Sequence, residues 1–171
     1  MTNVERALMI SEQVHRNQTY GIYPYMYHIN MVVELSQEFG MSEQLQITAA
    51  LHDTLEDGSI SYKDIELAFN EDIAEWVFAL SGYGRNRKER NANAYSKIQQ
   101  YESAIAIKLC DRIANMNHSK QYTPKLFKMY MNEYDSFISG IIPTSGPLPW
   151  NASVYKVALN KLNHIYYNTS V

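Results

Sequence analysis

Apolar residues recur at helical spacing along most of this chain, and this pattern constrains its fold more than any other feature. The clearest case is the i, i+3, i+4, i+7 series of Ile73, Trp76, Val77 and Leu80, which is typical of an amphipathic helix facing a core. We find no convincing strand pattern. The sequence therefore predicts an all-α fold, a bundle of about eight helices. Further helices are expected over residues 3–16, 26–39, 42–55 and 103–118. C-terminal helices are expected within 124–167.

The size and charge of the chain limit the classes of protein to which it can belong. Its 171 residues fit a single domain over 1–171, and a hydrophobic content of 46% is ordinary for a globular protein. A net charge of −3 and a pI of about 5.9 argue against a nucleic-acid or membrane surface. The one cysteine, Cys110, excludes an intrachain disulfide, and neither an apolar leader nor an 18-residue apolar run is present. We therefore expect a cytoplasmic protein, and the sequence leaves its oligomeric state open.

A histidine–aspartate doublet, His52-Asp53, interrupts an apolar helical stretch. Burying an imidazole and a carboxylate is costly without a compensating partner, and a divalent metal ion would supply one. Two further ligand types, His28 and Asp111, stand on other predicted helices. Each residue alone is a weak signal, but the four together predict a mixed nitrogen and oxygen metal site. Such a site suits Mn²⁺, with Fe²⁺, Co²⁺ or Zn²⁺ as alternatives.

Three segments around these residues carry a resemblance to a known family. They read PYMYH at 24–28, AALHDTLED at 49–57 and IKLCDRIANM at 107–116. The chain resembles the HD-domain phosphohydrolase superfamily, and within it the Rel/Spo-type small alarmone hydrolases. The Glu-Asp pair after His-Asp and the KLxDRxxNM string are much more specific than the doublet alone. The resemblance extends from residue 4 to about residue 118.

This resemblance carries expectations about fold, site and reaction. It implies stacked helices and removal of the 3′-pyrophosphate from guanosine tetra- or pentaphosphate, (p)ppGpp, leaving GDP or GTP. It implies catalytic roles for Glu56 and Asp57 and a substrate contact for Asn115. The metal ligands that it implies for one Mn²⁺ are His28, His52, Asp53 and Asp111.

The spacing of the acidic pair agrees with that chemistry. Glu56 follows His52 by four residues and Asp57 follows Asp53 by four, so on a helix both carboxylates would face the metal side. A carboxylate beside a metal ion can orient a water molecule and take its proton. The simpler reading is an acidic helix end, which the helix dipole disfavours.

Other polar residues are candidates for contact with a phosphorylated substrate. Asn115 follows Asp111 by about one helical turn and faces the same way, although it could be an ordinary surface residue. A glycine-opened loop at 82–90 could meet phosphates or could simply be solvated. The cations of this loop are Arg85, Arg87, Lys88 and Arg90.

The stretch before Pro24 departs from the family pattern. Thr19-Tyr20 stands where the family has an Arg-Lys pair that helps to hold the nucleotide. Tyr20 could stack on a base instead. The departure keeps open a second function, that of an HD-type deoxynucleoside triphosphate triphosphohydrolase or nucleotidase. A third possibility is an idle HD scaffold that binds a partner, although paired acidic residues beside a metal site argue against it.

Overall fold

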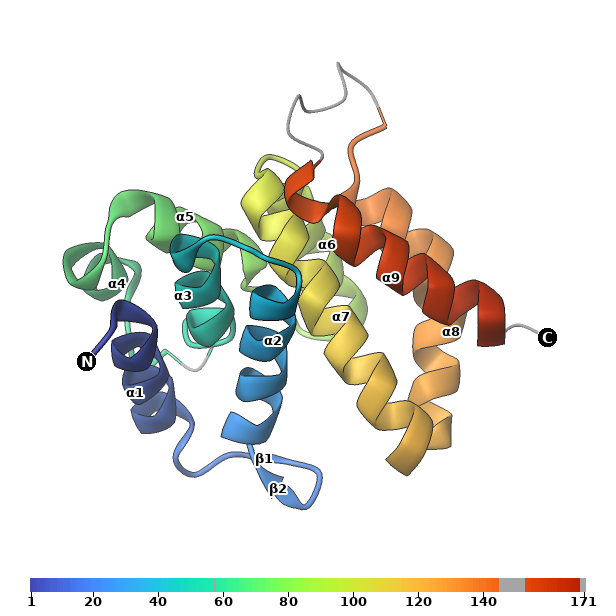
Figure 1. The fold of residues 1–171 in the computed structure, drawn as a ribbon, viewed down its shortest axis with the longest axis horizontal. Helices are drawn as coiled ribbons and strands as arrows, with labels where there is room; N and C mark the ends of the chain where they lie inside the picture. The colour runs from blue at the N-terminus through green and yellow to red at the C-terminus, as the bar shows by residue number, and fades with distance from the viewer. Residues whose placement is uncertain (57, 145–152, 170–171) are drawn as a thin grey trace.

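The computed structural model describes residues 1–56, 58–144 and 153–169, and nine α-helices make up most of this part (Figure 1). The all-α prediction is confirmed, with nine helices where about eight were expected. The helices are α1 (Asn3–His15), α2 (Met26–Glu38), α3 (Glu43–Leu51), α4 (Tyr62–Ala68), α5 (Glu71–Leu80), α6 (Arg87–Ile98), α7 (Glu102–Tyr122), α8 (Pro124–Ile141) and α9 (Ser153–Thr169).

Helix α7 lies at the centre of the bundle. It packs against α2 on one side and against α8 and α9 on the other (Figure 1). Ile105, Leu109 and Ile113 on this helix are fully buried. Burying each of these side chains stabilises the fold by about 1.5–3 kcal/mol. Because Asp111 belongs to the same buried stretch, the core also fixes the position of that carboxylate.

Helix α3 ends at Leu51, earlier than the sequence predicts. The Thr54 hydroxyl donates to the Leu51 carbonyl at 2.7 Å, and Nδ1 of His52 donates to the Ala49 carbonyl at 2.8 Å. Local bonds of this kind compete with the helical pattern for backbone carbonyls. The His52-Asp53 doublet therefore lies at the end of α3 and in the turn that follows, not inside a helix.

A short hairpin joins α1 to α2, where the sequence predicted no strand. Its strands are β1 (Thr19–Tyr20) and β2 (Tyr23–Pro24), which pair antiparallel with Tyr20 opposite Tyr23. Gly21 in the turn has a φ of 61°, a left-handed conformation that favours glycine. Strands of two residues are too short for a periodic pattern to predict them.

Helix α6 begins at Arg87, so much of the basic segment that was expected to be a loop is helical. The Asn86 side chain caps this helix by accepting a hydrogen bond from the Glu89 amide at 3.0 Å. The preceding loop lies close against α6, since a Cβ atom at Gly82 would come within 2.7 Å of the Arg90 carbonyl oxygen. Glycine at position 82 thus permits the close approach of loop and helix.

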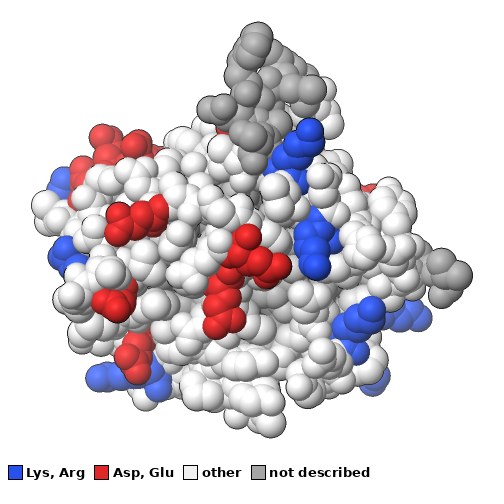
Figure 2. All heavy atoms as spheres, viewed as in Figure 1, with Lys and Arg blue, Asp and Glu red and all other residues white. Residues whose placement is uncertain are grey.

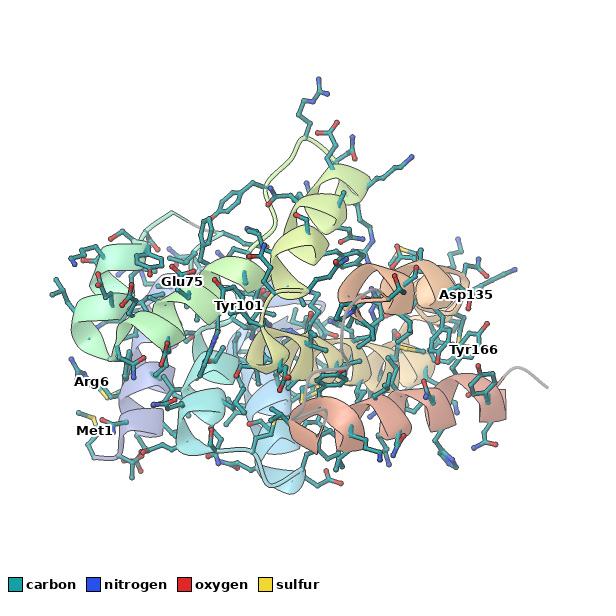
Figure 3. The ribbon with its side chains drawn as sticks, turned by 90° about the horizontal axis from the view of Figure 1, so that it is seen from above. Met1, Arg6, Glu75, Tyr101, Asp135 and Tyr166 are labelled. Atoms are coloured by element: carbon teal, nitrogen blue, oxygen red, sulfur yellow. The ribbon has the colours of Figure 1, made fainter. Side chains whose placement is uncertain are left out.

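A carboxylate joins α4 and α5 to the start of α7. Glu75 accepts a hydrogen bond from the Tyr62 hydroxyl at 2.8 Å and another from the Tyr101 hydroxyl at 3.1 Å (Figure 3). These bonds connect the N-terminal helices to the central helix.

The surface carries both signs of charge. On the face in Figure 2 an acidic group lies near the centre, and no broad basic area is visible there. Within the ranges that the structure describes, no helix has the length and apolar character needed to cross a membrane.

Candidate metal centre

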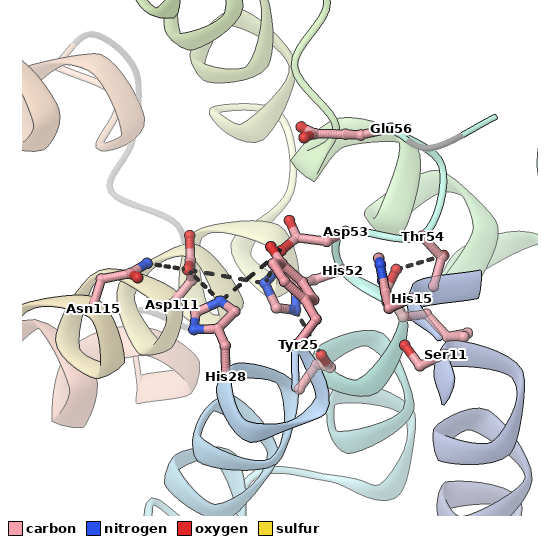
Figure 4. Close-up of polar contacts among 12 residues, drawn as sticks. Ser11, His15, Tyr25, His28, His52, Asp53, Thr54, Glu56, Asp111 and Asn115 are labelled. Atoms are coloured by element: carbon pink, nitrogen blue, oxygen red, sulfur yellow. Dashed lines mark hydrogen bonds and ion pairs between the residues drawn. The ribbon is translucent and has the colours of Figure 1, made fainter. Parts of the chain in front are cut away.

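Two histidines and two aspartates from three parts of the chain converge in the interior (Figure 4). Nε2 of His28, on α2, lies 3.1 Å from Oδ1 of Asp111 and 3.9 Å from Oδ2 of Asp53. Nε2 of His52 lies 3.1 Å from Oδ2 of Asp53 and 3.9 Å from Oδ1 of Asp111. The ligand atoms of His28, His52 and Asp53 all lie within 4.8 Å of one another, so they could hold one metal ion.

The orientation of His52 fits a metal ligand. Its Nδ1 atom donates to the Ala49 carbonyl, so in the neutral imidazole the lone pair lies on Nε2. Nε2 is buried and has no hydrogen-bond partner among the described residues, although Oδ2 of Asp53 is 3.1 Å away. A buried polar atom without a partner is costly, and a cation at this point would remove that cost. The residues present therefore fit a divalent metal ion.

The electrostatics of the cluster also favour a cation. Burial lowers the pKa of His52, but Asp53 and Asp111 raise it further, to about 9. Burial raises the pKa of Asp53, yet the adjacent His52 holds that pKa below its usual range. The pKa of Asp111 is well below its usual value because Lys108 and the two histidines outweigh its burial. The two aspartates are therefore ionised at neutral pH and together attract positive charge.

Neighbouring side chains orient the two carboxylates. The Tyr25 hydroxyl donates to Oδ2 of Asp53 at 2.6 Å. Lys108 donates to Oδ2 of Asp111 at 2.7 Å, and the Asn115 amide donates to Oδ1 of the same carboxylate at 2.7 Å. The expectation that Asn115 faces the same way as Asp111 is confirmed by this bond.

Glu56 lies beside the cluster, but not on a helix. The prediction that i+4 helical spacing aims it at the metal side is wrong, because it lies in the turn after α3. The Gly82 amide donates to its Oε1 at 2.7 Å and holds the side chain against the loop before α6. Desolvation and then the negative charge of Asp53 raise the pKa of Glu56. Asp57, its predicted catalytic partner, lies outside the described residues.

Tyr20 belongs to the wall of the same site. Its hydroxyl donates to Oδ1 of Asn115 at 2.7 Å. Its ring stacks on His28 with centroids 4.9 Å apart and an interplanar angle of 17°. The ring also lies near His118, with centroids 4.8 Å apart. Tyr20 thus contacts His28, which belongs to the cluster, and Asn115, which bonds to the Asp111 carboxylate of the cluster.

Comparison with known proteins identifies the family. A family model described as "HD domain" matches residues 7–133. This chain belongs to the HD domain family.

Relatives of this HD domain include much longer proteins. It is 32% identical over 120 residues to the guanosine-3′,5′-bis(diphosphate) 3′-pyrophosphohydrolase of Aquifex aeolicus, covering 66% of this chain and 17% of that protein. It is 30% identical over 136 residues to the protein of the same name from Borreliella burgdorferi, covering 72% of this chain and 20% of that one. The matched region is therefore a fifth or less of the length of these curated relatives.

Two solved structures share the fold. One belongs to a metazoan orthologue of SpoT, described as hydrolysing ppGpp and playing a role in starvation responses. It has a TM-score of 0.70 at 19% identity and covers 95% of this chain and 96% of that one. The other, lmo0812 from Listeria monocytogenes, has a TM-score of 0.55 at 19% identity and covers 82% of this chain and 99% of that one.

A basic pocket opens beside the cluster of two histidines and two aspartates in this HD domain. Its volume is about 140 Å³, and Asp53 and Glu56 form one side of it. The cations that line it are Arg87, Arg90 and Lys108. Two cations of the predicted basic loop, Arg87 and Arg90, thus line this pocket together with Lys108.

Two predicted substrate contacts lie outside this pocket. Arg85 pairs with Glu89 at 3.0 Å, and the Arg85 side chain is 89% exposed. Lys88 lines a neighbouring recess between α6 and α8. Arg85 precedes α6, whereas Lys88 follows Arg87 on that helix, where successive residues point in different directions.

Tyr25 is a residue of the site that was not predicted from the sequence. It precedes α2 and reaches Asp53, 28 positions later in the chain. The signal was available, since Tyr25 belongs to the PYMYH segment that carries the family resemblance. A tyrosine next to a predicted ligand helix could have been considered as a partner of a metal-binding carboxylate.

Proposed function

We propose that this HD domain is a metal-dependent phosphohydrolase that removes the 3′-pyrophosphate from (p)ppGpp-like alarmones. The observation that carries the proposal is a buried two-His, two-Asp cluster with Glu56 and a basic pocket directly beside it. The names of the Aquifex and Borreliella relatives support the choice of reaction. A nucleotide substrate of this kind would place the activity in the cytoplasm.

The metal ion is proposed to be held by four side chains. A mixed set of two imidazoles and two carboxylates suits Mn²⁺, with Fe²⁺, Co²⁺ or Zn²⁺ as alternatives. A divalent cation at this site would polarise a phosphate group and make a nearby water molecule more acidic. The proposed ligands are His28, His52, Asp53 and Asp111.

Residues around the cluster are proposed to supply the rest of the chemistry. Glu56 has a raised pKa and would accept a proton from the attacking water, with Asp57 as its partner. Lys108 and Arg90 line the pocket beside Glu56 and would bind the departing pyrophosphate. Asn115 would orient the nucleotide next to Asp111.

Product analysis by anion-exchange chromatography tests the proposal. Purified protein with Mn²⁺ is incubated with ppGpp, beside an Asp53→Ala control. We expect GDP and pyrophosphate in equimolar amounts from the wild type and neither from the control. Intact ppGpp with the wild-type protein would contradict the proposal.

Tyr20 favours a second candidate, an HD-type deoxynucleoside triphosphate triphosphohydrolase or nucleotidase. A tyrosine stands where the alarmone family has a basic pair, and it contacts both His28 and Asn115. A panel of deoxynucleoside triphosphates in the same assay separates the candidates, since turnover of these substrates alone would select the second. Metal binding with no turnover of any substrate would favour an idle scaffold.

A further inference from the structure

A single peptide group joins helix α6 to the proposed catalytic base. The Ser81 carbonyl oxygen accepts a hydrogen bond from Nζ of Lys97 at 2.6 Å. The amide of the next residue, Gly82, donates to Oε1 of Glu56 at 2.7 Å. This carbonyl and this amide belong to the same planar peptide unit. Lys97 and Glu56 are therefore connected through one peptide group, with the ammonium at its oxygen and the carboxylate at its N–H.

The Gly82 amide controls the direction of the Glu56 side chain. Glu56 lies in the turn after α3, where no helix determines its orientation. In the part of the chain that the structure describes, no other group donates a hydrogen bond to its carboxylate. The position of this one amide therefore decides where the carboxylate points.

Helices α5 and α6 hold the peptide group in place. The bond from Lys97 comes from α6. On the same helix, the Asn93 side chain accepts a hydrogen bond from the Tyr83 amide at 3.1 Å. Ser81 is fully buried, and its hydroxyl donates to the Val77 carbonyl of α5 at 2.8 Å. The segment that carries the amide is thus fixed from both sides.

Lys97 also has a structural role in the fold. It donates to the Phe78 carbonyl at 3.0 Å, near the C-terminus of α5, where the helix dipole favours a cation. Its Nζ lies 4.3 Å from the centroid of the Phe78 ring and 5.0 Å from that of the Tyr83 ring. These contacts fix the ammonium group, but only the bond to Ser81 leads on to Glu56.

The charges of Lys97 and Glu56 interact across the peptide group. Burial lowers the pKa of Lys97, and the negative charge of Glu56 counteracts part of this shift. Burial and the charge of Asp53 raise the pKa of Glu56, and the bond from the Gly82 amide opposes them. A cation at the carbonyl oxygen polarises the peptide group, which strengthens donation by its N–H. The ammonium of Lys97 therefore strengthens the bond that holds Glu56.

We propose that Lys97 is a positioning residue for Glu56 and acts through the Ser81–Gly82 peptide group. The inference rests on the proposed function, in which Glu56 accepts a proton from the attacking water. Lys97 does not line the basic pocket beside Glu56, so its influence on the reaction passes through the carboxylate. Lys97 would therefore affect the rate of the reaction and not the binding of substrate or metal.

Kinetics of Lys97 and Glu56 variants with ppGpp and Mn²⁺ test the proposal. Lys97→Met removes the charge and the hydrogen bonds but keeps an unbranched chain against the Phe78 ring. Lys97→Arg keeps the charge and the donors. Lys63→Met, at an exposed lysine on α4, is the matched control. Thermal unfolding checks that each variant is folded, and Lys97→Gln replaces Lys97→Met if that variant does not fold.

The expected result is a loss of rate that depends on Glu56. Lys97→Met should lower kcat about tenfold, since a small displacement of a catalytic group is costly, with KM and the Kd for Mn²⁺ unchanged. Lys97→Arg and Lys63→Met should both stay within about twofold of the wild type. In a Glu56→Gln background, Lys97→Met should cause no further loss, because the group that Lys97 positions no longer acts as a base.

Three results would overturn this inference and leave the proposed function standing. The first is a kcat for Lys97→Met equal to that of the wild type. The second is a loss of the same size in the Glu56→Gln background or in Lys97→Arg. The third is a loss that appears in KM or in the Kd for Mn²⁺ instead of kcat. Absence of ppGpp turnover by the wild type would overturn the proposed function and this inference with it.

Discussion

The hydroxyl group of Tyr25 donates a hydrogen bond to Oδ2 of Asp53 at 2.6 Å. Tyr25 stands at the N-terminus of α2, and Asp53 lies in the turn after α3, so the bond joins two of the elements that build the cluster. Oδ2 is also the Asp53 oxygen nearest to His28 and His52. The tyrosine therefore fixes the carboxylate oxygen that faces both histidines.

Replacing Tyr25 by Phe should weaken metal binding about tenfold, because loss of an outer hydrogen bond to a metal ligand commonly costs 10–100-fold in affinity. The aromatic ring remains, so its contact with the His15 ring, with centroids 4.7 Å apart, is retained. Isothermal titration with Mn²⁺ measures the effect, and Tyr27→Phe on the exposed side of α2 is the control. An unchanged Kd would show that Tyr25 has no influence on the metal site.

Replacing Glu56 by Gln should lower kcat by about 10²–10⁴-fold and leave the Kd for Mn²⁺ unchanged, since a general base contributes rate and not metal affinity. Glu56 acts only when ionised, and its pKa is raised. Wild-type kcat/KM should therefore fall as the pH drops through that raised pKa, above the ordinary range of a glutamate. The pH–rate profile of the variant should lack this acidic limb. A variant with wild-type kcat would remove Glu56 from the mechanism.

The helices could be predicted from apolar residues at regular spacing, and the His–Asp cluster from residue types that are costly to bury alone. The capping box of α4 is an example of such spacing, since the side chains of Ser61 and Asp64, three residues apart, close it. The four predicted ligands likewise lie together in the structure. A buried charge needs a partner, and charged residue types inside apolar stretches can be recognised in the sequence.

Element ends and long-range contacts could not be predicted in the same way. Helix α3 stops where Thr54 and His52 bond to backbone carbonyls, a competition that periodicity does not report. The bond from Tyr20 to Asn115 joins residues 95 positions apart, and only the packing of the hairpin against α7 brings them together. The positions of the cations at 85–90 similarly depend on where α6 begins.

Metal affinity should rise with pH up to about 9. His52 must lose its proton before Nε2 can bind a metal ion, and its pKa in the metal-free protein is raised to about 9. Below that pH, metal must displace the proton, so the apparent association constant should increase by up to about tenfold per pH unit and then level off. Asp53 and Asp111 stay ionised throughout because their pKa values are lowered.

Titrations with Mn²⁺ at pH 6.5, 7.5 and 8.5 measure how the association constant changes with pH (buffer values chosen to lie at roughly one-unit steps below the pKa). A flat profile would mean that His52 is already neutral or is not a ligand.

Two substitutions of Tyr20 should separate its ring from its hydroxyl. Tyr20→Phe keeps the stack on His28 but removes the hydrogen bond to Asn115, so KM should rise several-fold while the Kd for Mn²⁺ is unchanged. Tyr20→Leu removes both contacts, so metal affinity should fall as well, because an aromatic contact of this kind is worth about 0.5–1.5 kcal/mol. Tyr23→Leu on the other strand of the hairpin is the control for general disturbance of this region.

If Tyr20→Phe and Tyr20→Leu have the same Kd for Mn²⁺, the Tyr20 ring does not support His28. If neither changes KM, Tyr20 takes no part in holding the substrate, and the tyrosine in place of the basic pair has no bearing on specificity.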